Sequence, residues 1–338
     1  MQINLVSDTI TKPSPEMLEF MMAAELGDDV FSTDPTVNEL EDKMANMFGK
    51  ESAIFCPSGT MTNQIAVKLH TRALDELICD ESSHVFQYET GGYAYNARVG
   101  INLIRGQFGK ITAEQIDKAI KADHDWLPSS SLVVLENSTN KGGGNYYTLD
   151  EIRPIRELCQ KRALKLHLDG ARIFNVLVET KESTIEVGQL FDSISVCLSK
   201  GLGAPIGSVL IGSKEDIRRA RRFRKVMGGG MRQVGIIAAG GIYALDNNIS
   251  RLKEDNDRAK ELGQFLSGLE YVEEVLPVKT NIVIFKLAQE SAESFLKRLK
   301  QKGIDAAPFG EMQVRFVTHM HFGNEDLEKT KEILSSMA

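Results

Sequence analysis

The chain has 338 residues, of which 26% are charged and 42% hydrophobic, as is ordinary for a globular protein. At about 100–200 residues per domain, this length predicts two domains. The formal net charge of −7 argues against a nucleic acid or an anionic membrane as the partner, and no apolar run approaches the ~18 residues that span a bilayer.

The cysteines favour a reducing compartment. They form no C-x-x-C pair and lie in apolar or helical contexts, so we expect no disulfide framework. The first residues also lack the basic region and apolar core of a signal peptide. A cytoplasmic protein is therefore expected. The cysteines are Cys56, Cys79, Cys159 and Cys197.

The first 50 residues combine irregular chain with two predicted helices. The polar triplet Ser7-Asp8-Thr9 directly follows a short apolar run, and Pro15 then opens a helix. Thr36 and Glu39 have the spacing of a capping box at the start of a second helix.

A strand over residues 53–56 is followed by the small-residue turn Ser58-Gly59-Thr60 and then by a helix. Such a turn presents free backbone N–H groups and the positive end of the helix dipole, which suits a phosphate group. The alternative is an ordinary helix cap by Ser58 or Thr60.

His84 lies just past the next predicted strand, residues 76–79. In that position its flat ring can face the carboxyl edge of a sheet and stack on a pyridine ring. The alternative is a structural hydrogen bond, which is the commoner role of a single histidine.

Two short apolar runs, residues 164–168 and 194–198, predict neighbouring buried strands. Asp169 and Arg172 follow the first run and Lys200 follows the second. Ligands of open α/β sheets bind at the carboxyl ends of the strands, so these three side chains are expected to meet in one crevice. A lysine and an acid are what pyridoxal phosphate needs, for its Schiff base and its pyridine nitrogen. Taken singly, the aspartate fits a helix cap and the lysine a solvent-exposed tip equally well.

The alternation of strands and helices predicts a doubly wound α/β domain, followed by a smaller α+β domain. A long helix over residues 234–269, interrupted near 247–248, is expected to contain the boundary. We expect an N-terminal segment that contributes to the active site, a large cofactor-binding domain and a small C-terminal domain, at residues 1–20, 21–248 and 249–338.

The small domain offers one further candidate, Arg315, which alternates with apolar residues on a predicted strand. It can pair with a substrate carboxylate, and a structural ion pair is the equal alternative. His319 and His321 are expected on one face of the same strand. A metal site needs more ligands than these, so none is predicted.

Motifs spread over nearly the whole chain resemble the low-specificity L-threonine aldolases. That resemblance implies dependence on pyridoxal 5'-phosphate, the aspartate-aminotransferase fold (fold type I) and a homotetramer of dimers whose active sites lie at the interface. The motifs are Ser7-Asp8-Thr9, Gly27-Asp28-Asp29-Val30, Asp34-Pro35-Thr36-Val37, His167-Leu168-Asp169-Gly170-Ala171-Arg172, Leu198-Ser199-Lys200-Gly201-Leu202, Gly228-Gly229-Gly230-Met231-Arg232-Gln233 and Val314-Arg315-Phe316-Val317-Thr318-His319.

The resemblance also implies roles for matching residues. Lys200 would hold the cofactor as a Schiff base, Asp169 would keep the pyridine nitrogen protonated, and His84 would stack on the ring and assist proton transfer. The residues expected to bind the phosphate are Ser58, Gly59 and Thr60, and those expected to bind the substrate carboxylate are Ser7, Arg172 and Arg315, with Arg172 also counted at the cofactor.

Two positions depart from the family pattern. Phe31 stands where a tyrosine is common, and Trp126 stands where a histidine is common, with His124 two positions away. That histidine is thought to touch the β-hydroxyl of the substrate. The preference between threonine and allo-threonine is therefore left open.

The predicted reaction is retro-aldol cleavage of a β-hydroxy-α-amino acid to glycine and an aldehyde. A β-eliminating lyase, a racemase or an aminotransferase can use the same lysine, aspartate and arginines. A nicotinamide oxidoreductase is disfavoured, because residues 201–207 miss the G-x-G-x-x-G spacing and lead into a strand. A non-catalytic binding protein is disfavoured by the presence of both Asp169 and Lys200.

Overall fold

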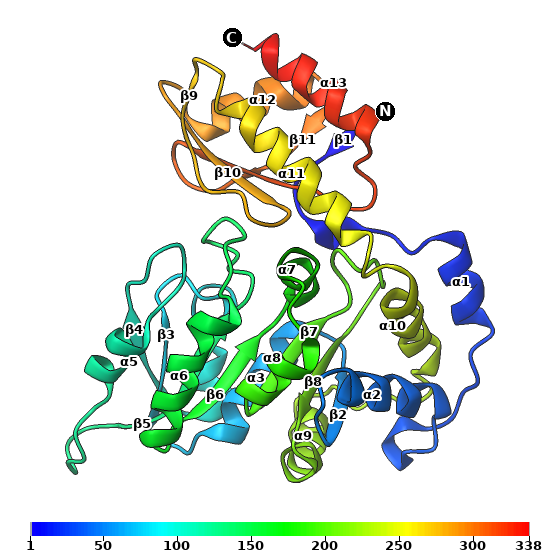
Figure 1. Cartoon of the computed structure of the whole chain (residues 1–338). Coiled ribbons are helices and arrows are strands. Elements are labelled where there is room, and N and C mark those ends of the chain that lie inside the picture. The colour runs from blue at the N-terminus through cyan, green and yellow to red at the C-terminus, as the bar shows by residue number, and fades with distance from the viewer. Residues whose placement is uncertain (1, 338) are drawn as a thin grey trace.

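The computed structural model describes residues 2–337 and shows two packed units (Figure 1). The larger unit is built on a seven-stranded mixed sheet in the order β2-β8-β7-β6-β5-β3-β4. Only β8 runs against its neighbours, and the other pairs are parallel. The strands are β2 (Ser52–Cys56), β3 (Asp75–Asp80), β4 (Gly100–Ile104), β5 (Ser129–Glu136), β6 (Lys165–Asp169), β7 (Ser193–Cys197) and β8 (Ser208–Gly212).

Helices cover both faces of this sheet, which explains why its central strands are near-continuous apolar runs. Along β5, Val133 and Leu135 belong to the core cluster on one face, whereas Leu132 and Val134 belong to the cluster on the other. The helices of the first face include α2 (Pro35–Met47), α6 (Leu149–Lys161), α7 (Ile173–Thr180) and α8 (Thr184–Leu190), and those of the second include α3 (Gly59–His70) and α9 (Lys214–Val226). The doubly wound architecture predicted from the sequence is thus confirmed.

The smaller unit is an antiparallel sheet in the order β12-β13-β10-β9, packed against three helices. Its elements are α11 (Leu252–Leu266), β9 (Val272–Val275), β10 (Ile282–Leu287), α12 (Ala292–Gln301), β12 (Ala307–Pro308), β13 (Gln313–Val317) and α13 (Asn324–Ser335). The expected long helix is divided, because α10 (Gly235–Asn247) ends before α11 begins. The proposed domain limits remain a prediction.

The N-terminal segment crosses between the two units. Its first strand, β1 (Ile3–Asn4), pairs in parallel with β11 (Ile304–Asp305) of the smaller unit. Its helix α1 (Pro15–Met22) packs on α10 of the larger unit (Figure 1). Residues 5–14 therefore run past the junction of the two units.

The expectation for His319 and His321 is wrong in one respect. Strand β13 ends at Val317, so both histidines lie in the turn that follows rather than on a strand. The turn is held by His319, whose Nε2 lies 2.7 Å from the carbonyl oxygen of Asn4.

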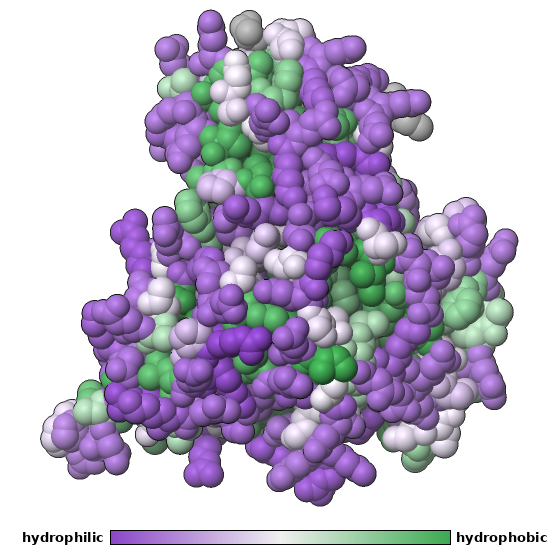
Figure 2. Space-filling view, viewed as in Figure 1, coloured by the Kyte–Doolittle hydropathy of each residue, from purple (hydrophilic) through white to green (hydrophobic). Residues whose placement is uncertain are grey.

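The described chain contains no helix with the length and apolar character needed to cross a bilayer. Its surface is mostly hydrophilic, with apolar side chains gathered around α1 at one edge (Figure 2). The exposed apolar residues of this helix are Leu18, Phe20 and Met22. All four cysteines are free and buried.

Candidate active site

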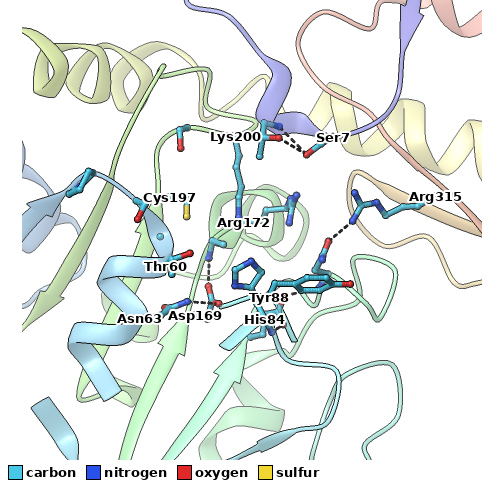
Figure 3. A pocket seen from close by; sticks show the side chains of 18 of the residues that line it. Ser7, Thr60, Asn63, His84, Tyr88, Asp169, Arg172, Cys197, Lys200 and Arg315 are labelled. Atoms are coloured by element: carbon cyan, nitrogen blue, oxygen red, sulfur yellow. Dashed lines mark hydrogen bonds between the residues drawn. The ribbon is translucent and has the colours of Figure 1, made fainter. Parts of the chain in front are cut away.

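A cavity of about 490 Å³ lies at the carboxyl edge of the large sheet, below the smaller unit. Every residue proposed from the sequence lines it, although the segments that carry them are far apart in the chain (Figure 3). These residues are Ser7, Ser58, Gly59, Thr60, His84, Asp169, Arg172, Lys200 and Arg315.

Asp169 and Lys200 reach the cavity from neighbouring strands. Asp169 is the last residue of β6 and is nearly fully buried, and its carboxylate accepts hydrogen bonds from Asn63 Nδ2 (2.8 Å) and from the N–H of Ala171 (3.2 Å). Lys200 follows β7, and its carbonyl oxygen accepts a bond from the hydroxyl of Thr11 (2.9 Å). The N-terminal segment therefore fixes the backbone that carries the lysine.

The ring of His84 is oriented by Glu89. Its Nδ1 lies 2.9 Å from Glu89 Oε1, while its backbone N–H donates to Glu136 Oε2 (3.0 Å). Burial alone would lower the pKa of His84, but the hydrogen bond that its ring donates to Glu89 and the nearby carboxylates outweigh burial and raise it. Because Nδ1 is engaged by Glu89, Nε2 is the nitrogen left for a ligand in the cavity.

The start of α3 supplies a seat for an anion. The N–H groups of its first turn have no preceding carbonyl within the helix. Ser58 does act as the cap, because its Oγ accepts from the N–H of Met61 (3.2 Å). A Cβ on Gly59 would lie 2.5 Å from Cys197 Sγ, so glycine is what lets α3 begin this close to the end of β7. Both the cap and the anion seat are therefore compatible with the turn.

The side chain of Arg172 is paired with Asp8, a residue that the sequence analysis did not select for the site. Its Nε and Nη2 donate to the two carboxylate oxygens of Asp8, each at 2.7 Å, and both side chains are buried. Burial alone would raise the pKa of Asp8, but the charge and hydrogen bonds of Arg172 lower it to about 2. Only Nη1 of Arg172 is left outside this pair.

Arg315 has a different environment. Its Nη1 donates to Asn140 Oδ1 (3.1 Å) and its Nη2 to the carbonyl oxygen of Val6 (3.2 Å). Within residues 2–337 no carboxylate forms a salt bridge with it, and its buried Nε has no hydrogen-bond partner. Burial and the neighbouring Arg172 lower its pKa. An anionic ligand would relieve both the unpaired charge and the unpaired Nε.

Glu136, at the end of β5, is the most perturbed acid of the cavity. Burial, and then the charge of Asp169, raise its pKa to about 7. Its two oxygens accept from the N–H of His84 and the N–H of Asn140 (2.9 Å). It thus anchors the chain beside the histidine and beside the partner of Arg315.

Sequence reasoning missed the residues that orient the others. The sequence did offer a pattern for two of them. Asp8 is the centre of a polar triplet, and Glu136 is the charged residue that ends an apolar strand. Asn63 and Glu89 carry no sequence signal that separates them from ordinary helix and loop residues. The missed residues are Asp8, Asn63, Glu89, Glu136 and Asn140.

The residues present fit pyridoxal phosphate. The cavity combines a lysine, a buried carboxylate opposite it, a flat histidine ring and a helix N-terminus. In addition, the buried Nε of Arg315 has no hydrogen-bond partner, so it can donate to a ligand. The lysine would hold the Schiff base, the carboxylate the pyridine nitrogen, and the histidine the ring face. The helix N-terminus would hold the phosphate, and Arg315 an amino-acid carboxylate.

Comparisons with known proteins agree with this fold and show the family. Residues 4–290 match the family model described as beta-eliminating lyase. The structure is similar to that of the Leishmania major threonine aldolase, with a TM-score of 0.85 and 21% identity over 99% of each chain, which confirms the fold-type I architecture. The sequence is 40% identical to the low specificity L-threonine aldolase of Escherichia coli (strain K12) over 96% of each chain. It is 38% identical to the probable low-specificity L-threonine aldolase 2 of Arabidopsis thaliana, over 96% of this chain and 94% of that protein. The chain belongs to the low-specificity L-threonine aldolase family.

Proposed function

We propose that the protein is a pyridoxal-phosphate-dependent aldehyde-lyase. Its substrates are L-threonine, L-allo-threonine or related β-hydroxy-α-amino acids, and its products are glycine and an aldehyde. The observation that carries the proposal is that Lys200, Asp169 and the uncompensated Arg315 face one cavity. Membership of the family supplies the reaction type.

The cofactor would be held by residues from three parts of the chain, which are the loop after β7, the end of β6 and the start of α3. Lys200 would hold its aldehyde group as a Schiff base, and Asp169 would pair with its pyridine nitrogen. Ser58, Gly59 and Thr60 receive the phosphate at the start of α3. When bound, pyridoxal phosphate supplies an electron sink for the carbon–carbon bond that breaks.

Arg315 is proposed as the main ligand of the substrate carboxylate, with Ser7 beside it. Binding of the carboxylate fixes the orientation of the substrate, and therefore which bond to Cα is aligned for cleavage. Arg172 contributes at most its free Nη1, because Asp8 holds its other two donors.

His84 is the proposed base for the β-hydroxyl proton. Its Nδ1 is held by Glu89, so Nε2 accepts the proton, and Glu89 stabilises the charge that results. This arrangement gives one face of the cavity a group that can both take up and return a proton.

The test begins with the visible spectrum of the purified protein. A band at ~420 nm that disappears with borohydride, and is absent in Lys200→Ala, establishes a lysine-bound cofactor. Incubation with L-threonine and with L-allo-threonine should then yield glycine and an aldehyde. A protein that stays colourless with added pyridoxal phosphate would overturn the proposal.

A β-eliminating lyase is the second candidate, since the family model carries that description. Racemases and aminotransferases place similar groups around the same cofactor. The products separate them, because a lyase releases a keto acid and ammonia, whereas a racemase changes only the configuration of the amino acid.

The proposed assembly is a homotetramer of dimers that share their active sites. A surface cavity on α3 and α9 adjoins the end of the active-site cavity that is proposed to bind the phosphate, because Ser58 and Thr60 line both cavities. The exposed Tyr95 and Val226 lie on the same surface. A second copy seated there would cover apolar surface and close the site. Sedimentation velocity tests the assembly.

The buried free thiols support a reducing, cytoplasmic location.

A further inference from the structure

A row of buried polar side chains lies between α3 and the strands β6 and β7. Asn63 and His70 lie two turns apart on α3 and therefore on one face of it. They meet His167 of β6 and Ser193 of β7, which are 0% and 1% exposed. The row starts at Asp169 in the cavity and ends near the opposite edge of the sheet, and only Asn63 among the four lines the cavity.

The two carboxylates beside Asn63 fix the orientation of its amide. Its Nδ2 lies 2.8 Å from Asp169 Oδ2 and 2.9 Å from Glu89 Oε1. Carboxylates only accept hydrogen bonds, so this atom is the nitrogen and donates to both. The amide oxygen of Asn63 is thereby left facing His167 Nε2 at 3.2 Å.

The amide oxygen in turn favours one tautomer of His167. An oxygen that only accepts pairs with a proton on Nε2. Burial, and then the neighbouring His70, lower the pKa of His167 to about 3, so the ring is neutral and carries one proton. The backbone oxygen of Ser193 lies 3.1 Å from Nδ1 and would accept that proton in the other tautomer. We assign the proton to Nε2, because Nδ1 then has the Ser193 hydroxyl as a donor at 2.8 Å and Nε2 has the amide oxygen of Asn63 as an acceptor. The Ser193 oxygen in turn accepts from His70 Nε2 (2.8 Å).

Each hydrogen bond of the row therefore donates in the direction of Asp169. Aligned donors strengthen one another in a low-dielectric interior and stabilise negative charge at the end of the chain. Apolar clusters flank the row on both sides, one joining α3 to β2 and β8 and the other joining α3 to β3 and β5. The row restricts the Asp169 carboxylate, whose Oδ2 has Asn63 as its partner and whose Oδ1 has the N–H of Ala171.

We propose that His167 is a positioning residue of this site, because its hydrogen bond to Asn63 fixes the carboxylate of Asp169 that faces the pyridine nitrogen of the cofactor. The inference rests on the proposed function for the identity of the cofactor. It assigns to His167, which does not touch the cavity, an effect on cofactor binding.

Two variants of the same residue separate positioning from packing. The amide nitrogen of His167→Gln can take the place of Nε2 and keep the bond to Asn63, whereas that of His167→Asn reaches only the place of Nδ1. Both remove the ring. We expect the dissociation constant of pyridoxal phosphate, measured on apoprotein, to rise about tenfold in His167→Asn and less than about threefold in His167→Gln. The melting temperatures of the two apoproteins should fall alike.

Equal cofactor affinities in the two variants, or a loss of affinity that follows the loss of melting temperature, would overturn the inference. Wild-type protein that binds no pyridoxal phosphate would overturn the proposed function and this inference together, so the two failures are distinguishable. A further readout needs neither a variant nor the cofactor. The ¹⁵N spectrum of histidine-labelled apoprotein should show a neutral ring with its proton on Nε2 for His167, and a proton on Nδ1 would contradict the proposed order.

Discussion

Asp8 and Arg172 form a buried, two-point ion pair that joins the N-terminal segment to the large unit. Asn281 of the smaller unit also donates to Asp8 Oδ2 (3.2 Å). A single carboxylate therefore holds together three parts of the chain at the edge of the cavity. The pair also limits what Arg172 can offer to a substrate.

Replacing Asp8 by asparagine should destabilise the fold. Removing one member of a buried pair leaves the other charge uncompensated, which costs about 3–5 kcal/mol. Because the folded-state pKa of Asp8 is about 2, below the ordinary 3.8, its stabilisation is present above about pH 4 and is lost as the pH falls toward 2. Urea unfolding at pH 7 and pH 3 should show a smaller difference between wild type and Asp8→Asn at the lower pH.

The double variant Asp8→Asn/Arg172→Met is the control for this prediction. It removes both charges, so it should recover part of the stability lost in Asp8→Asn. If Asp8→Asn alone is as stable as wild type, the ion pair does not hold the segment.

The two arginines should respond differently to substitution by lysine. Arg315 lacks a carboxylate partner in the described chain, so Arg315→Lys should raise KM for the amino acid, with a loss of about 1.5–3 kcal/mol or ~10–100-fold in kcat/KM. Arg172→Lys breaks the two-point contact with Asp8 and should mainly lower the melting temperature. Steady-state kinetics and thermal unfolding of both variants check this division, and an equal rise in KM for the two would contradict it.

Glu89 should set the pH dependence of the reaction through His84. Because the pKa of His84 is raised in the folded protein, the basic form appears only as the pH rises through that value. Glu89→Gln removes the charge that raises it, so the acid limb of the kcat/KM profile should move to lower pH and the maximal rate should fall. Glu81→Gln, an exposed acid of the same loop region, is the matched control and should leave the profile unchanged. A limb that does not move would exclude His84 as the base.

The sequence was informative where chemistry lies at the end of an apolar run. Asp169 and Lys200 could be placed because buried strands bounded by glycine end just before them. Asp8 and Arg172 are 164 positions apart, and no local pattern indicates that they pair. The two histidines after Val317 were misplaced because apolar alternation does not show where strand pairing stops.

Glu136 should make the apoprotein less stable as the pH rises from about 4.5 to about 7. Its pKa is raised from 4.5 to about 7, so over that range the folded protein holds a proton that the unfolded chain has lost, and the free energy of unfolding falls with pH. Glu136→Gln cannot titrate, and the comparison with wild type cancels the contributions of the buried histidines, which change stability in the opposite direction. Urea unfolding at pH 5 and pH 8 should show a decline in wild type, relative to Glu136→Gln, of at most about 3 kcal/mol. Parallel behaviour of the two proteins would mean that Glu136 is ionised throughout, and that its charge is balanced by the N–H groups of His84 and Asn140 alone.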